Sequence, residues 1–287
     1  MTSDAATDVF ETQRPRLTRL AYRMLGSLAE AEDAVQDAWL RWRGTDQAEV
    51  ADPAGWLVRA TTRLSIDRLR ADKARRAAYR GPWLPEPLIE NMAVDPMERA
   101  EDVSVAFLLA LERLTPLERA VFLLHEAFDA DYAQIAQTLG RSEAACRQLA
   151  SRARAHVQEA RPRFHVSDAE AASLAGAFMQ AAQDGDWVRL GELLAEDAVL
   201  ISDGGGKRKA ALRPLVGRED VVALIKGLAW RSGWIRGGDL RPARINGALG
   251  AVIDGPDGAS TIAFEVTEPG RIGAIYIVRN PDKLKGL

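Results

Sequence analysis

The chain has 287 residues, 47% of them hydrophobic and 28% charged, and a formal net charge of −3 at pH 7. This length suits two or three domains, and the nearly balanced charge excludes a globally basic protein, so any DNA contact must use a local patch. The single cysteine, Cys146, excludes an internal disulfide, and the absence of a long apolar run predicts a cytoplasmic protein with no membrane partner.

Residues 8–80 form the first predicted domain, a helical bundle with turn signals at Gly26 and at Asp52-Pro53. Within it, residues 31–42 (AEDAVQDAWLRW) predict an amphipathic helix. Its apolar face consists of Ala34, Val35, Ala38, Trp39 and Trp42. Its polar face consists of Asp33, Gln36, Asp37 and Arg41. This polar face is either solvated or docked on a basic partner helix.

The end of this domain is strongly cationic. Eight cations occur in this segment with only two acids, Asp67 and Asp72. The cations are Arg59, Arg63, Arg68, Arg70, Lys73, Arg75, Arg76 and Arg80. Such a patch either is a solvated helix face or neutralises DNA phosphates, which releases counterions.

A proline-containing linker is predicted over residues 81–102, beginning with GPWLPEPL. Proline fixes φ and lacks a backbone N–H, so this piece is neither a helix interior nor a central strand. We expect a stiff, extended connector. Trp83 provides an aromatic side chain that we expect to be buried by another part of the chain.

Residues 103–163 form a second helical domain, broken at 114–116, at 129–131 and at Gly140. A short helix over 132–139 and a helix capped by Ser142 predict a helix-turn-helix, with an ordinary helical hairpin as the alternative. The predicted buried stripe is Cys146, Leu149, Ala150 and Ala153, which makes Cys146 a core residue. The residues left outside are Arg147, Gln148, Ser151, Arg152 and Arg154.

Residues 167–287 predict an α+β domain. Ser167 and Glu170 form a capping pattern for an alanine-rich helix, and helices are expected near 187–194 and 219–229. Strands are expected within 198–202, 243–255, 260–267 and 271–278, joined by Asn-Gly, Asp-Gly and Pro-Gly turns. The carboxylates Asp197, Asp239 and Glu265 have no histidine partner in this domain. We therefore predict no catalytic residue, no metal and no cofactor.

The order of these segments resembles a bacterial extracytoplasmic-function sigma factor. The residues that carry the resemblance are AEDAVQDAWLRW, the basic helix GWLVRATTRLSIDRLRADKARR, and the helix-turn-helix preceded by LTPLERAVFLL. WLPEPL, DGGGK at 203–207 and NPDKL at 280–284 resemble the SigJ-like subgroup, which carries a fused SnoaL-like domain. The resemblance implies two all-α sigma domains, region 2 and region 4, followed by an α+β cone.

The resemblance also implies partners and roles. The partners are the β′ clamp and β flap of core RNA polymerase, and promoter DNA. Asp33, Gln36 and Asp37, beside Arg41, would meet the clamp. Arg63 and Asp67 would read the minus-ten element, with the neighbouring cations on phosphates, and Arg147, Gln148, Ser151 and Arg152 would read the minus-thirty-five element. Arg63 stands where asparagine is frequent in the family, so the family's base preference does not carry over to this position.

Regulation is the last expectation from the resemblance: the third domain grips the connector and replaces a separate anti-sigma protein. The residues assigned to this contact are Trp83, Leu84, Pro85, Glu86, Pro87, Leu88, Asp203, Gly204, Gly205, Gly206, Lys207, Asn280, Pro281, Asp282, Lys283 and Leu284. The cone implies a cavity that could hold a small-molecule ligand. Two alternatives are a helix-turn-helix regulator with a ligand-sensing domain and an enzyme whose cavity processes a small molecule.

Overall fold

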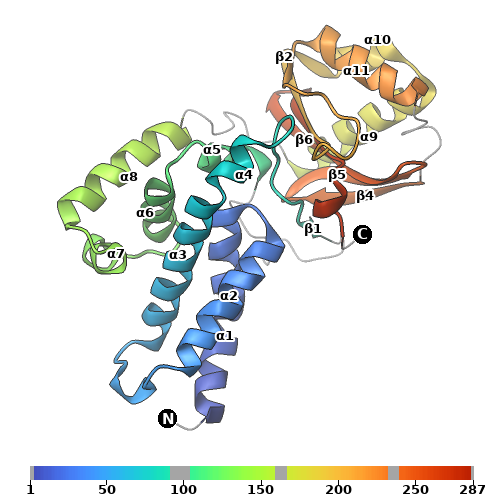
Figure 1. Ribbon diagram of the computed structural model, residues 1–287. Coiled ribbons are helices and arrows are strands. Elements are labelled where there is room, and N and C mark those ends of the chain that lie inside the picture. The colour runs from blue at the N-terminus through green and yellow to red at the C-terminus, as the bar shows by residue number, and fades with distance from the viewer. Residues whose placement is uncertain (1–2, 91–103, 159–166, 232–238, 286–287) are drawn as a thin grey trace. The chain divides into compact units, whose positions relative to one another are not determined.

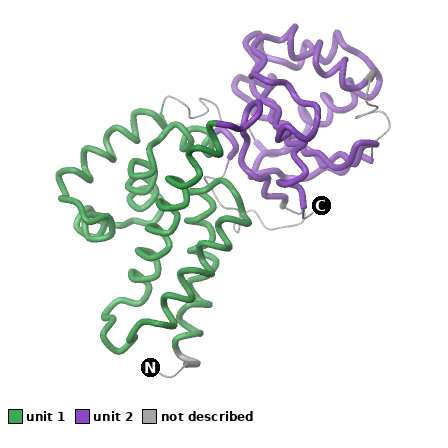
Figure 2. The backbone as a smooth tube through the Cα atoms, viewed as in Figure 1, with its two compact units in different colours: residues 1–77, 107–161 green, residues 78–106, 162–287 purple. Residues whose placement is uncertain are grey.

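The structure is a computed structural model that describes residues 3–90, 104–158, 167–231 and 239–285. The chain divides into two compact units (Figure 2), one made of residues 1–77 and 107–161, the other of residues 78–106 and 162–287. Parts of the predicted linker, at 91–102, and of the predicted second helical domain, at 103 and 159–163, lie outside the described residues.

The first half of unit 1 consists of α1 (Ser3–Leu25), α2 (Leu28–Arg43), the short 3-10 helix η1 (Gln47–Glu49), α3 (Pro53–Ala71) and α4 (Lys73–Ala77) (Figure 1). Asp52 caps α3 by accepting a hydrogen bond from the Gly55 N–H at 2.9 Å, and Pro53 occupies the first turn. Trp42 is fully buried and donates to the Ala6 carbonyl at 3.1 Å. Trp39, expected in the same apolar face, is only partly buried.

The second half of unit 1 contains α5 (Val105–Glu112), which begins at the boundary with unit 2, α6 (Pro116–Glu126), α7 (Tyr132–Leu139) and α8 (Glu143–Gln158). Gly140 ends α7 with φ +63°, a left-handed conformation that favours glycine. Cys146, Ala150 and Ala153 are buried in α8, as the stripe predicts, while Leu149 is only partly buried. The predicted helix-turn-helix is therefore confirmed.

Unit 2 is built on one mixed sheet. Its strands lie in the order β1-β4-β5-β6-β7-β2-β3, and only the β2–β7 pairing is parallel. The strands are β1 (Ile89–Glu90), β2 (Leu194–Asp203), β3 (Leu215–Val216), β4 (Asp239–Ile245), β5 (Ala248–Gly255), β6 (Gly258–Glu268) and β7 (Arg271–Val278). The helices are α9 (Asp168–Asp184), α10 (Trp187–Glu192), α11 (Arg218–Arg231) and the 3-10 helix η3 (Pro281–Lys283).

The three longer helices of unit 2 cover one face of the sheet (Figure 1), where Phe178 of α9 packs on Phe264 of β6 with ring centroids 5.0 Å apart. Register shifts near Val266 mark bulges, which increase the local twist of the sheet. Ser167 caps α9 by accepting from the Glu170 N–H, as the capping pattern predicts. The predicted α+β fold class is confirmed.

The carboxylate of Glu265 belongs to the sheet rather than to a catalytic pair. Burial raises its pKa, and the Tyr276 hydroxyl donates to it at 2.8 Å. Residues alternate between faces along a strand, so Glu265 points away from the helix-covered face that holds Phe264.

Among the described helices, none combines the length and the apolar character that a membrane span requires.

Candidate nucleic-acid interface and connector site

The outer face of α8 carries the residues expected to read DNA. Arg147, Gln148, Ser151 and Arg152 are exposed, whereas Arg154 is partly buried. Arg147 pairs with Glu143 at 2.7 Å, and Arg154 pairs with Glu126 at 2.6 Å. These are surface ion pairs of small net stability, so the arginines can exchange their carboxylate partners for phosphate oxygens.

Arg152 lies 3.2 Å from Glu118, which belongs to the capping box at the start of α6. Burial raises the pKa of Glu118, but hydrogen bonds from the hydroxyl and backbone of Thr115 outweigh it, so the pKa lies below its usual value. Glu118 is therefore ionised near neutral pH, and its ion pair with Arg152 links α6 to α8, the second helix of the helix-turn-helix.

The cationic segment of α3 and α4 is partly neutralised within unit 1. Arg68 binds Asp37 at 2.6 Å, and Arg70 lies 3.5 Å from Asp67. Arg75 forms ion pairs with Glu30 and Asp72, and Lys73 is exposed. The free positive charge of this patch is therefore smaller than the sequence count of eight cations indicates.

The polar face of α2, expected to meet polymerase, is largely accessible. Asp33, Gln36 and Arg41 are exposed. Asp37 is half-buried, and its carboxylate accepts the hydrogen bond from Arg68. A partner that binds Asp37 must compete with this internal ion pair.

Arg63 does not point freely to solvent. Its Nε donates to the Thr138 carbonyl at 2.7 Å, and its Nη2 donates to the Gln137 carbonyl at 3.2 Å. These carbonyls belong to the last turn of α7, where a helix has unsatisfied acceptors and negative dipole charge. Arg63 therefore caps the first helix of the helix-turn-helix.

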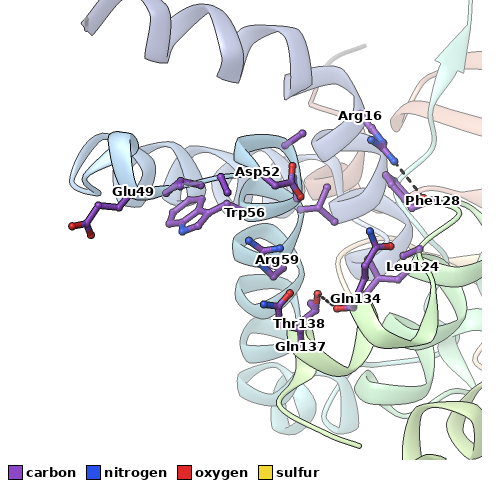
Figure 3. A pocket seen from close by; sticks show the side chains of 16 residues that line it. Arg16, Glu49, Asp52, Trp56, Arg59, Leu124, Phe128, Gln134, Gln137 and Thr138 are labelled. Carbon is purple, nitrogen blue, oxygen red and sulfur yellow. Dashed lines mark hydrogen bonds between the residues drawn. The ribbon is translucent and has the colours of Figure 1, made fainter. Parts of the chain in front are cut away.

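Beside this contact lies a cavity of about 590 Å³ (Figure 3). Trp56 and Arg59 of α3 line it from one side, and Leu124, Phe128 and Gln134 line it from the other. Among these five residues, only Arg59 belongs to the cationic segment recognised in the sequence. The rest of the cavity arises from pairing of residues far apart in the chain, which no local pattern reveals.

A second contact joins the two helical halves of unit 1 through Glu112. Its carboxylate accepts from Arg119 at 2.7 Å and also from Arg76. Arg119 is 3% exposed and donates to the Met24 carbonyl at 2.6 Å, while Arg76 donates to the Leu25 carbonyl at 2.6 Å. Burial lowers the pKa of Arg119, and Glu112 opposes that shift.

In unit 2 the connector is bound by a buried carboxylate. Asp203, at the end of β2, is fully buried, and its carboxylate accepts four hydrogen bonds from described residues. The donors are the Tyr79 hydroxyl at 2.6 Å, the Leu84 N–H at 2.9 Å, the Gly205 N–H at 2.9 Å and the Lys283 ammonium at 2.7 Å. Burial and then the hydrogen bond to Asp203 raise the pKa of Tyr79.

Trp83 is half-buried, so the expectation that it is buried is wrong. The fully buried side chain is the next one, Leu84. The ammonium of Lys283 lies 4.2 Å from the centroid of the Trp83 ring, a cation–π geometry, and it also donates to the Leu84 carbonyl. The indole covers the ammonium of Lys283, whereas the aliphatic Leu84 is fully buried in unit 2.

The DGGGK and NPDKL segments meet at the same place. Gly205 and Gly206 have φ of +61° and +70°, and the Lys207 N–H donates to the Gly204 carbonyl at 3.0 Å, which fits a type I′ turn. A Cβ on Gly205 would lie 2.3 Å from the Asn280 amide carbon. Lys207 binds Asp282 at 2.6 Å, and Asn280 donates to the Tyr79 hydroxyl at 2.8 Å.

The far end of the described connector is held by the turn between β4 and β5. The Leu88 N–H donates to the Asn246 side chain at 3.2 Å, and the Asn246 N–H donates to the Leu88 carbonyl at 2.8 Å. β1 then pairs with β4. In the sequence, Asn246 is recognisable only as a turn residue. The role of Tyr79 was missed, although its position next to the connector was a usable signal.

Comparisons with known proteins agree with this layout. Residues 9–75 match the family Sigma-70 region 2, and residues 104–157 match Sigma-70, region 4. The chain is 40% identical over 290 residues to the ECF RNA polymerase sigma factor SigJ of Mycobacterium tuberculosis, covering 96% of this chain and 92% of SigJ. It is 37% identical over 196 residues to the probable ECF RNA polymerase sigma factor SigI of that species, covering 67% of each. The crystal structure of SigJ superposes with a TM-score of 0.79 at 37% identity, covering 98% of both chains.

Proposed function

This chain belongs to the ECF RNA polymerase sigma factors, non-enzymatic proteins that direct the polymerase core to promoters, and we propose how its parts divide that task. Region 2, over residues 8–80, binds the β′ clamp and reads the minus-ten element. Region 4, over residues 103–163, contacts the β flap and reads the minus-thirty-five element. The third domain, over residues 167–287, regulates both by holding the connector.

The exposed polar face of α2 supports the clamp contact. Asp33 and Gln36 are exposed, so both side chains are accessible to a partner protein. For region 4, exposure of Arg147, Gln148 and Arg152 supports base and phosphate contacts from α8 in a major groove. Each base contact of good geometry should contribute about 1–3 kcal/mol of discrimination.

The contact between Arg63 and α7 supports a closed state of regions 2 and 4. The two promoter elements lie about 25 base pairs apart, or about 85 Å along the DNA axis. A compact unit of about 130 residues has a radius of gyration of about 14 Å. Regions packed as in unit 1 therefore cannot read both elements at once, and they must separate on the promoter.

The occupied connector supports regulation by the third domain. The Leu84 N–H and carbonyl, and those of Leu88, are all bonded within unit 2, and the Leu84 side chain is buried there. A segment with these groups occupied cannot at the same time bind another protein through them. Docking of the connector therefore opposes its use between regions 2 and 4 on polymerase, and undocking favours transcription.

A pull-down of core polymerase tests the assignment of α2. The double variant Asp33→Ala/Gln36→Ala should weaken binding of the full chain to core at least tenfold, whereas Asp8→Ala, which removes an exposed acid from α1, should leave it unchanged. Equal retention of core by both variants would reject the clamp assignment. Sequence-specific binding of a duplex by a dimer without polymerase would favour the alternative, a ligand-sensing helix-turn-helix regulator.

A further inference from the structure

The glycine loop that follows β2 encloses a cavity that the proposed function does not use. Its volume is about 330 Å³, within the size range of small-molecule sites. It is lined by Ser202, by the loop itself and by Arg80, the residue directly before the connector. Arg80 lies directly against the loop, because a Cβ added to Gly206 would come within 3.3 Å of the Arg80 Cβ.

The charge on this lining is of one sign. Arg80, Lys207, Arg208 and Lys209 all line the cavity, and no acid does. Lys207 is paired with Asp282, and Arg208 donates to the Ala259 carbonyl at 2.7 Å. Arg80 and Lys209 are exposed and form no ion pair in the part of the chain that the structure describes. Like charges around one concavity repel each other, and a bound anion removes that repulsion.

A buried hydroxyl adds a donor to these charges. Ser202 is 2% exposed and lines the cavity. Its Oγ accepts from the Ala211 N–H at 2.8 Å, and among the described residues its hydroxyl hydrogen has no acceptor. A buried hydroxyl with an unused hydrogen is suited to an oxyanion.

The loop is fixed before any ligand arrives. Arg279 is 2% exposed, binds Asp257 and donates to the Lys209 carbonyl at 2.8 Å. The turn at Gly205-Gly206 anchors the other end of the loop, next to the buried Asp203. Groups held in place by buried contacts lose little conformational entropy on binding, which favours affinity for a small ligand.

We propose that this cavity binds a small anion that carries a diphosphate group, either free or attached to an organic molecule. Arg80 and Lys209 supply the uncommitted charges, and Ser202 donates a hydrogen bond. The ligand contacts the glycine loop together with Arg80, directly before the connector, so it stabilises the docked arrangement of this segment by ordinary ligand linkage. The effect on transcription rests on the proposed function, but binding itself does not.

Isothermal titration calorimetry of the full chain at low ionic strength tests the site, with inorganic pyrophosphate, ADP and adenosine as probes. Pyrophosphate and ADP should each bind with one-to-one stoichiometry, and adenosine should not. Arg80→Ala and Lys209→Ala should each weaken binding about tenfold or more, since each removes a charge-assisted contact. Lys226→Ala, which removes an exposed lysine from α11 of the same unit, should bind as the wild type does.

Limited proteolysis checks whether the ligand contacts Arg80, directly before the connector. Pyrophosphate should slow tryptic cleavage after Arg80, because Arg80 lines the cavity. Thermal unfolding of each variant without ligand establishes that it is folded. Absence of binding by both phosphate probes overturns the proposal, as does equal weakening in Lys226→Ala. A non-promoter DNA duplex that displaces pyrophosphate, and that binds less tightly to Arg80→Ala and Lys209→Ala, would also overturn the proposal. Such a result would assign these two cations to the DNA backbone. None of these results depends on polymerase, so they are distinct from a failure of the proposed function.

Discussion

Arg63 of α3 donates hydrogen bonds to the carbonyls of Thr138 and Gln137 at the end of α7, with 2.7 Å between its Nε and the Thr138 oxygen. The residue expected to read the minus-ten element thus caps a helix of the domain expected to read the minus-thirty-five element. Its guanidinium cannot satisfy both partners, so promoter reading by Arg63 requires this contact to break.

Arg63→Ala should therefore have opposite effects on two measurements. Amide hydrogen exchange in α7 of the free chain should become faster, because the last turn loses two donors and a favourable dipole interaction. Promoter opening with core polymerase should fall. Arg70→Ala removes an exposed arginine from the same helix and should leave exchange in α7 unchanged. Unchanged exchange in Arg63→Ala would show that the contact does not hold α7.

Glu112→Ala should destabilise unit 1 by about 2–3 kcal/mol. The substitution leaves the buried Arg119 without its carboxylate partner. Breaking a fully buried ion pair costs about 3–5 kcal/mol, and we expect a smaller loss here because Glu112 is partly exposed. Urea unfolding would measure the change. Glu143→Ala breaks the exposed pair with Arg147 and should cost only about 0.3–0.5 kcal/mol. Similar losses in the two variants would contradict a structural role for Glu112.

Asp203→Asn should release the connector. The substitution keeps the shape but removes the charge that offsets Lys283, and leaving one partner of such a pair uncompensated costs about 2–4 kcal/mol after allowance for partial exposure of the lysine. Cleavage by trypsin after Arg80 should become faster. Asp282→Asn breaks only the exposed pair with Lys207 and should change the rate little. Equal cleavage rates in wild type and Asp203→Asn would contradict docking through Asp203.

The hydroxyl of Tyr79 predicts an alkaline dependence of connector docking. Its pKa is raised above 10, first by burial and then by the hydrogen bond to Asp203, so the folded state favours the neutral phenol. This contribution to stability is fully present below pH about 10 and is lost as the pH rises through the raised value.

Absorbance titration of the tyrosines would test this dependence. Tyr79 and Tyr276 should both ionise late, because burial raises the pKa of each. Tyr79→Phe should remove one late-ionising group, and Asp203→Asn should shift that group to lower pH. A late population that is unaltered in both variants would contradict the proposed environment of Tyr79.

Local patterns predicted much of this structure. The residues of the α7 helix, the end of that helix at Gly140 and the cap at Ser167 depend on neighbouring residues, and the structure has all three as expected. The backbone carbonyls that Arg119 and Arg63 bind belong to distant segments, so no spacing in the sequence reveals these contacts. The cationic patch was overestimated for the same reason, since Asp37 and Glu30 reach it from another helix.

The connector has one feature that its own sequence predicts and one that depends on distant residues. The lack of helix and strand at 82–88 follows from the prolines, whereas the cation–π contact of Trp83 depends on where Lys283 lies. Judged by hydrophobic size alone, Trp83 is the side chain expected to be buried. The Lys283 ammonium is placed next to the indole by the fold around η3, which lies outside the connector sequence.

The most direct test of regulation by the third domain is run-off transcription with core polymerase, on a promoter selected by the holoenzyme, at limiting sigma factor. We predict that Asp203→Asn yields more transcript than the wild-type chain, and that Asp282→Asn yields the wild-type amount. Equal or lower output from Asp203→Asn, with its connector shown by trypsin to be released, would contradict the account.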